Sequence, residues 1–331
     1  MGPMFFGDRA QAQATSLALG KLKSTSVRLA EELGSGRKAD VAAGLGGDLR
    51  ELLALRRTAE VGTAVLRMAS EAALRAEGRQ TVLTQMQESL GNVSSAVATL
   101  FPETSPERKA LAAGTARAAL ADTLAKLNTV LGGRALFAGT LSSGPAVIQA
   151  DDLLSRLTAE LTGAVTQEDV SSRIEAWFND PNGWAAQGYQ GGPAATALTL
   201  GPGGPQIADR TAQDPRLRGL LAALATAAFL DRSPASAAPG TMAGMALSRL
   251  ADAKDGLVAL SAEIGVDEER IAATRAGREA EAFSIEMAIA ARTGADPART
   301  AIELEATRTS LETLYAVTAR MSRLSLADFL R

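Results

Sequence analysis

The feature that most constrains the fold of this chain is the regular spacing of apolar residues from about Thr241 to Arg331. Apolar side chains recur there at three-, four- and seven-residue steps, which places them on one face of an α-helix. The spacing predicts two long helices separated by one break. In the first helix the pattern falls on Leu247, Leu250, Leu257, Leu260, Ile264 and Ile271, and more weakly on Phe283, Ile285, Met287 and Ile289. In the second it falls on Leu304, Leu311, Leu314, Tyr315, Thr318, Met321 and Leu324.

The break between these helices lies at residues 293–297. Gly294 is suited to the left-handed conformation that ends many helices, and Asp296 and Pro297 suit the cap and the first position of the next one. The second helix is apolar along one side and needs a partner. We predict that its partners are the N-terminal helix and other copies of the chain.

The N-terminal part shows a similar stripe from Leu17 onwards, interrupted at residues 34–37 and loosened by glycines at 44–47. A long helix is expected from about Asp48. Its strongest signal is a heptad seam at Leu83, Met86, Leu90, Val93, Val97 and Leu100. The N-terminal stripe itself is formed by Leu19, Leu22, Leu29 and Leu33.

A further helix is predicted after Phe101-Pro102, because Ser105-Pro106-Glu107 combines an N-cap, a proline at the first helical position and an acid in the first turn. We expect this helix to stop at Gly132-Gly133. Its stripe is formed by Leu111, Leu120, Leu124, Leu127 and Leu131.

Residues 141–240 are different in composition, being rich in Gly, Pro, Ala and Thr. Residues 179–183 have turn chemistry, and residues 197–204 predict a short strand with a tight loop. Short helices are expected at Leu153–Leu161 and Leu217–Leu230. The fold class is therefore mainly α: a long antiparallel helical bundle or coiled coil built from both chain ends, with a small α+β insert.

We predict three parts from this arrangement. Residues 1–45 and 295–331 form terminal helices. Residues 46–140 and 241–294 form a helical bundle domain. Residues 141–240 form an α+β insert domain.

Composition narrows the function. The chain has no cysteine and no histidine, which excludes thiolate chemistry, His-ligated metals and Ser-His pairs. A net charge of −3 without a basic cluster disfavours nucleic-acid binding. The most apolar run, at 219–230, is shorter than the roughly 20 residues that span a membrane.

Few residues suggest a catalytic or ligand-binding site. The neighbouring carboxylates Asp151-Asp152 and Glu268-Glu269 point in different directions on a helix and are expected to be solvated. Residues 34–38 resemble a phosphate loop only superficially, and residues 179–183 are better explained as a turn than as a calcium site. The aromatic residues Trp177, Phe178, Trp184 and Tyr189 suit a core better than a sugar or peptide site. We expect no enzyme activity, cofactor or metal.

Three separated motifs carry a family resemblance. Leu33-Gly34-Ser35-Gly36-Arg37-Lys38, followed by Ala43-Gly44-Leu45, is similar to the N-terminal "L-S-S-G-K/R … A-G-L" signature of the flagellin superfamily, although Asp40-Val41-Ala42 stands where Asp-Asp-Pro is usual. Residues 127–140 are similar to the "N-x-x-x-x-G-R-Y-L-F-A/S-G" run of the hook-associated protein 3 family, with Gly133, Arg134, Leu136, Phe137 and Gly139 in the matching places. Residues 321–330 are similar to its "I-S-x-L-S-L-x-D-Y-L" ending.

The resemblance implies an extracellular structural subunit of the bacterial flagellum, exported through the type III channel without a cleaved signal peptide. It also implies three layers: terminal helices that are disordered in the monomer and line the inside of a tube, then the helical bundle, then residues 141–240 as a variable outer domain. Its expected partners are copies of itself in a helical tube, a neighbouring hook-associated protein, flagellin and an export chaperone. No nucleic acid or membrane is expected. We predict an assembly interface formed by Leu22, Leu29, Leu33, Leu311, Leu314, Met321, Leu324, Leu326, Phe329 and Leu330.

Other functions stay open. A junction protein between hook and filament is the leading hypothesis, and flagellin, which shares the same ends, is the nearest alternative. From a different class, the heptads could belong to a soluble coiled-coil scaffold or signalling protein. An enzyme housed in residues 141–240 is a remote third.

Overall fold

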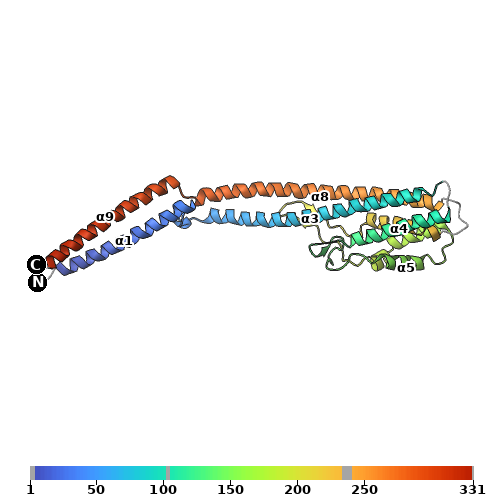
Figure 1. Cartoon of the computed structure of the whole chain (residues 1–331), viewed down its shortest axis with the longest axis horizontal. Coiled ribbons are helices and arrows are strands. Elements are labelled where there is room, and N and C mark those ends of the chain that lie inside the picture. The colour runs from blue at the N-terminus through green and yellow to red at the C-terminus, as the bar shows by residue number, and fades with distance from the viewer. Residues whose placement is uncertain (1–3, 102–104, 233–240, 330–331) are drawn as a thin grey trace. The chain divides into compact units, whose positions relative to one another are not determined.

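A computed structural model describes the backbone of residues 4–101, 105–232 and 241–329 (Figure 1). Side chains are described for residue 10 and for residues 13–101, 105–232 and 242–320. The chain is mainly α-helical with two small hairpins, which confirms the predicted fold class. The helices are α1 (Met4–Ser35), α2 (Val41–Gly44), α3 (Arg50–Ala98), α4 (Pro106–Leu127), α5 (Ala150–Glu160), α6 (Gln167–Asn179), η1 (Trp184–Gly188), α7 (Pro215–Ala228), η2 (Leu230–Arg232), α8 (Thr241–Thr293) and α9 (Pro297–Phe329). The antiparallel hairpins are β1 (Val130–Leu131) with β2 (Arg134–Ala135), and β3 (Leu198–Thr199) with β4 (Gln206–Ile207).

The chain divides into two compact units. Unit 1 comprises residues 1–63 and 280–331, and unit 2 comprises residues 64–279. The division falls within α3 and α8, so each of these helices contributes to both units. The three-layer organisation expected from the sequence stays a prediction.

In unit 1, α1 and α9 pack against each other and run antiparallel (Figure 1). The interruptions that flank them in the sequence also meet. Lys38 N donates to Thr293 O at 2.9 Å, and Ala295 N donates to Gly36 O at 3.0 Å. At the start of α9, Asp296 Oδ1 accepts hydrogen bonds from the backbone of Ala298 and Arg299, which confirms the predicted cap.

Unit 2 is built on one hydrophobic core to which α3, α4, α7 and α8 all contribute. The predicted heptad seam is confirmed, since all six of its side chains are buried, five of them on α3 and Leu100 just after its end. Helix α7 packs against α4 and α6, so the helices of residues 141–240 share this core rather than forming one of their own.

Several local predictions are corrected by the structure. Gly294 does not have a positive φ. Instead, its N–H donates to Ala290 O at 2.7 Å, and a Cβ at this position would lie 2.7 Å from the same oxygen. A glycine is therefore required by close approach rather than by a left-handed turn.

The helix after Ser105 ends at Leu127 instead of Gly132-Gly133. Leu131 belongs to β1, and Leu111 is exposed on α4. On α8, Phe283 and Met287 are also exposed, because the buried face continues from Ile271 to Ile285, and residues two positions from Ile285 point to the other side. Helix α6 was not expected from the sequence.

Candidate assembly surface

The helices α1 and α9 form a seam with heptad spacing. On α9 the buried and half-buried positions follow steps of four and three residues, as in a coiled coil. They are Thr300, Leu304, Thr307, Leu311, Leu314 and Thr318. On α1 the corresponding positions are Thr15, Leu19, Leu22, Ser26 and Leu29. The sequence pattern arises because each helix buries this face against the other.

The structure places part of the predicted assembly interface in this seam. Leu29 is buried, and Leu22, Leu311 and Leu314 are half-buried. Leu33, at the end of α1, is exposed. The other predicted residues lie outside the described side chains, namely Met321, Leu324, Leu326, Phe329 and Leu330.

A second set of apolar side chains on the same helices is exposed. Leu17 is 71% exposed on α1 and Ile302 is 71% exposed on α9. Val27, Tyr315 and Val317 are also exposed. The sequence pattern placed Tyr315 on the buried stripe, which is wrong, and started the N-terminal stripe at Leu17, which is exposed. It did not identify Val27, Ile302 or Val317. Their signal was an apolar residue away from the seam on a helix that already had one apolar face.

Glu32 fixes the connection between α1 and α2. Its side chain is almost fully buried, and Oε1 accepts hydrogen bonds from Ala39 N at 3.1 Å and Arg28 Nη1 at 2.8 Å. These contacts and the backbone bonds to residues 293–295 define a hydrogen-bonded joint at residues 34–38. They explain this glycine-containing segment without a phosphate ligand.

The family-like run at residues 133–139 forms a hairpin and a buried loop. Gly132 and Gly133 both have positive φ, at 58° and 77°, and make the turn between β1 and β2. Arg134 is exposed, and its Nε donates to Ser142 Oγ at 2.9 Å. Leu136 and Phe137 are buried in the core of unit 2. The run is therefore a structural element of unit 2.

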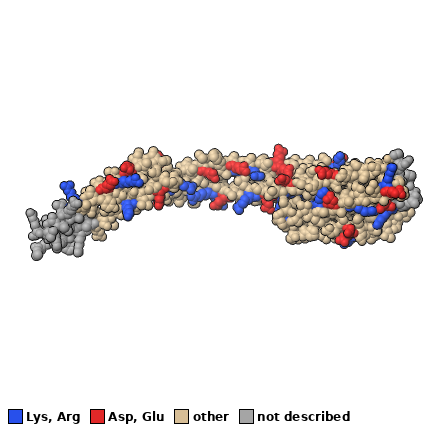
Figure 2. All heavy atoms as spheres, viewed as in Figure 1, with Lys and Arg blue, Asp and Glu red and all other residues tan. Residues whose placement is uncertain are grey.

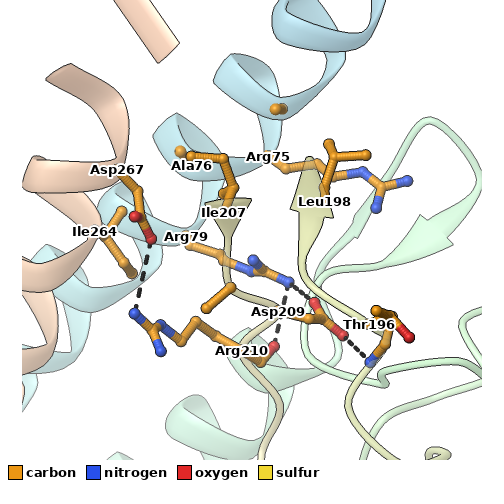
Figure 3. Close-up of a pocket in the computed structure, with 13 residues that line it drawn as sticks. Arg75, Ala76, Arg79, Thr196, Leu198, Ile207, Asp209, Arg210, Ile264 and Asp267 are labelled. Atoms are coloured by element: carbon orange, nitrogen blue, oxygen red, sulfur yellow. Dashed lines mark hydrogen bonds and ion pairs between the residues drawn. The ribbon is translucent and has the colours of Figure 1, made fainter. Parts of the chain in front are cut away.

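Arg79 of α3 holds this loop in place. Its Nε and Nη2 donate to Leu136 O at 3.1 and 2.9 Å. Nη2 also donates to Asp209 Oδ1 at 2.6 Å (Figure 3). Asp209 Oδ2 in turn accepts from Ala195 N at 2.9 Å. Burial lowers the pKa of Arg79, and the Asp209 carboxylate opposes that shift. One buried ion pair thus joins α3, the family-like loop and the segment after β4.

The pocket around this pair contains charged groups that are already paired. Arg210 Nη2 lies 3.1 Å from Glu263 Oε2 and 3.7 Å from Asp267 Oδ2. Arg75, which also lines the pocket, pairs with Glu71 on its own helix. The charges of this pocket form an ion-pair cluster that joins α3, α8 and the segment after β4.

The aromatic residues of unit 2 are core residues. Trp177, Phe178 and Trp184 are buried, with ring centroids 5.0–6.3 Å apart. Trp184 Nε1 donates to Ala212 O at 3.1 Å, and Tyr189 Oη donates to Gly192 O at 2.6 Å. The structure therefore favours the core over a sugar or peptide site. Asp180 accepts a hydrogen bond from Asn182 N in the predicted turn.

Comparisons with known proteins give matches among solved structures alone. No protein family model matches the chain, and no curated protein matches it. Among solved structures, it is similar to one described as a putative flagellar hook-associated protein from Vibrio parahaemolyticus. The two share 11% sequence identity with a TM-score of 0.49, over 72% of this chain and 94% of the other. At this level the similarity does not by itself assign a function.

The geometry of unit 1 suits helix–helix contacts. Figure 2 shows positive and negative side chains interspersed over the face that it draws, without a region of one sign. Among the described residues, no group of three or more potential metal ligands occurs. None of the described helices is long and apolar enough to cross a membrane. The surface features that stand out on the described end helices are their exposed apolar side chains.

Proposed function

We propose that this chain is a structural subunit of the bacterial flagellum that joins the hook to the filament. The proposal combines two independent lines of support. The first is the three sequence motifs, of which the run at residues 127–140 and the ending at 321–330 favour the junction protein over flagellin. The second is the pairing of the two ends of the sequence in one helical unit.

The observation that carries the proposal is the distribution of apolar side chains on α1 and α9. One face of each helix is used in the seam, yet Leu17, Val27 and Ile302 are left exposed on the other faces. Burying these side chains against another surface would be favourable, by about 25 cal/mol for each Å² of apolar area removed from water. A subunit whose end helices pair with each other and then pack against neighbours would use both faces.

In this account the chain has no enzymatic role. It is exported through the flagellar type III channel, accompanied by a chaperone, and assembles outside the cell. Deferring the order of the terminal helices until assembly would couple their folding to association. The neighbours would be copies of the chain, another hook-associated protein and flagellin.

Immunogold labelling of intact flagella tests the location. An antibody against residues 141–240 is expected to label a single cluster where the hook meets the filament. Label along the whole filament would instead identify a flagellin. Intact, accessible flagella that carry no label would contradict both assignments.

A substitution at the C-terminal motif tests the mode of assembly. Leu326→Asp should give a soluble, helical subunit that no longer joins the flagellum, because a charge would replace an apolar contact. Normal incorporation would refute this. A coiled-coil scaffold predicts a well-ordered terminal helix in the isolated chain, so limited proteolysis distinguishes it from a subunit that orders on assembly.

A further inference from the structure

A second, smaller hollow adjoins the Arg79–Asp209 ion pair in unit 2. It is bordered by α3, by the family-like run and by the segments that carry Ala195 and Asp209. Its volume is about 40 Å³, whereas a single water molecule needs only ~10–15 Å³. The hollow therefore has room for one small polyatomic group.

Positive charge dominates the lining of this hollow. Its charged lining residues are three arginines and one acid, namely Arg75, Arg79, Arg134 and Asp209. Both oxygens of the acid are already used. Asp209 Oδ1 accepts from Arg79 Nη2 at 2.6 Å, and Oδ2 accepts from Ala195 N at 2.9 Å. The lining therefore offers more cationic donors than its own carboxylate can satisfy.

The charge of Arg134 is the least compensated of the three. Its Nε donates to the neutral Ser142 Oγ at 2.9 Å, and among the described residues no carboxylate forms an ion pair with it. Arg75 does pair with Glu71, but the Glu71 side chain is 64% exposed, so water screens that interaction. The hollow is left with a net positive charge.

Like charges also repel each other around this hollow. Arg75 and Arg79 are four residues apart on α3, and like charges at this spacing on a helix are unfavourable. Burial is the main cause that lowers the pKa of Arg79, and the Asp209 carboxylate opposes that shift. The nearby charges of Arg75 and Arg210 lower it further. A bound anion would relieve this repulsion.

We propose that this hollow binds one oxyanion group, the phosphate or the carboxylate of a small molecule. Guanidinium groups suit this role because their planar fork donates parallel hydrogen bonds to the oxygens of either group. Arg134 and Arg75 are less buried than Arg79 and would meet the anion, while Arg79 is already bonded to Leu136 O and mainly adds charge. Every residue of the site belongs to unit 2, so binding is independent of the proposed flagellar role.

Binding of inorganic phosphate to the full-length chain tests the site. The phosphorus NMR signal of phosphate should broaden in the presence of the chain, and the effect should saturate at one phosphate per chain. Acetate should reverse the broadening, because it offers the same kind of oxygens to the guanidinium groups. Absence of saturable binding, or binding that acetate does not reverse, would overturn the proposal.

Arg134→Gln tests the guanidinium group. Because Arg134 is exposed, its loss should leave the fold intact while raising the Kd for phosphate by about tenfold or more, since a hydrogen bond to a charged group is lost. Arg108→Gln is the matched control, because Arg108 is an exposed arginine of α4 that does not line the hollow. Equal affinities of the two variants would contradict the site.

Two substitutions of Ser142 separate charge from shape. Ser142 lines the hollow with its Oγ 2.9 Å from Arg134 Nε, so Ser142→Asp places a carboxylate beside that guanidinium. This tethered carboxylate should compete with phosphate and raise its Kd by about tenfold or more. Ser142→Asn has the same size without the charge and should change the Kd by less than about threefold. Equal binding by both variants would refute the role of charge.

Urea unfolding gives an independent readout. Tryptophan fluorescence follows unit 2, which contains Trp177 and Trp184, and a ligand bound to the folded state raises the unfolding midpoint. Phosphate also stabilises folded proteins generally through its exclusion from their surface, and this effect should be the same in all variants. The midpoint should therefore rise more in the wild-type chain than in Arg134→Gln. An equal rise would leave only the general effect and overturn the proposed site.

Discussion

Substitution of Gly139 tests why a glycine is needed at this position of the family-like run at residues 133–139. Its φ is +60°, and a Cβ at this position would lie 2.4 Å from Pro193 O and 2.6 Å from Gly192 O. Gly132 has nearly the same φ, +58°, but no atom lies within 4 Å of its Cβ position. The substitutions Gly139→Ala and Gly132→Ala therefore share the conformational cost and differ in the steric one.

The expected magnitudes follow from these distances. A left-handed alanine costs about 1–2 kcal/mol, which is the whole effect expected for Gly132→Ala. At Gly139 the loop must also move by about 1 Å to bring the closest contact from 2.4 Å to the ordinary 3.4 Å. Forced backbone shifts of this kind cost about 1–3 kcal/mol more. Gly139→Ala should therefore lower the free energy of unfolding of unit 2 by about 2–5 kcal/mol.

Urea unfolding followed by tryptophan fluorescence measures this difference in unit 2. Both tryptophans, Trp177 and Trp184, lie in that unit and are buried there, so the signal reports its unfolding and not that of the paired end helices. The midpoint should fall further for Gly139→Ala, with little change in the denaturant slope. Two variants that agree within about 0.5 kcal/mol would refute the close-approach argument.

Three further predictions concern the seam and the ion pairs. Leu304→Ala should weaken the α1–α9 pairing that forms on assembly by about 2–5 kcal/mol and raise the protein concentration needed for half-assembly. Leu111→Ala, an exposed control in unit 2, should assemble like the wild-type chain. Arg79→Met should lower the free energy of unfolding of unit 2, measured in urea, by about 3–5 kcal/mol, because Asp209 loses its buried partner. Arg75→Met, whose ion pair is exposed, should lower it by only about 0–1 kcal/mol. Hydrogen bonds from Arg216 help to lower the pKa of Asp214, despite an opposing effect of burial, and they also lower the pKa of Glu263. A carboxyl group whose pKa is lowered in the folded state contributes stability above its ordinary pKa, and this contribution is lost as the pH falls below that value. Arg216→Gln should therefore make the loss of stability between about pH 4.5 and pH 2 smaller than in the wild-type chain.

The helical framework could be predicted because it depends on residues close in sequence. The heptad at Leu83 to Leu100, the cap at Ser105 and the break before Pro297 all follow from local spacing and capping. Each of these signals requires only a few neighbouring positions. Their structural outcome agrees with the expectation.

Features that depend on distant partners could not be predicted. The end of α4 at Leu127 is set by the hairpin that follows, in which Leu131 pairs with Arg134. Arg79 carries no sequence signal of its own, because its partners Leu136 and Asp209 lie 57 and 130 residues away. The end of a helix was correctly predicted at Gly294, but for the wrong reason, because only the structure reveals its contact with Ala290.

The candidate surface was predicted only in part. Periodicity identified the faces of α1 and α9 that pair with each other, including Leu22 and Leu311. The exposed residues Val27 and Ile302 escaped notice because a single stripe was sought on each helix. A second face becomes recognisable only when the first is known to be occupied.

The number of copies per flagellum tests the junction role most directly. Flagella with attached hooks can be sheared or grown to different filament lengths. Mass spectrometry of each sample then gives the number of copies of this chain relative to a hook protein. The account predicts a small, constant number of copies per hook, whatever the length of the filament. A copy number that rises in proportion to filament length would contradict the junction role and identify a filament subunit.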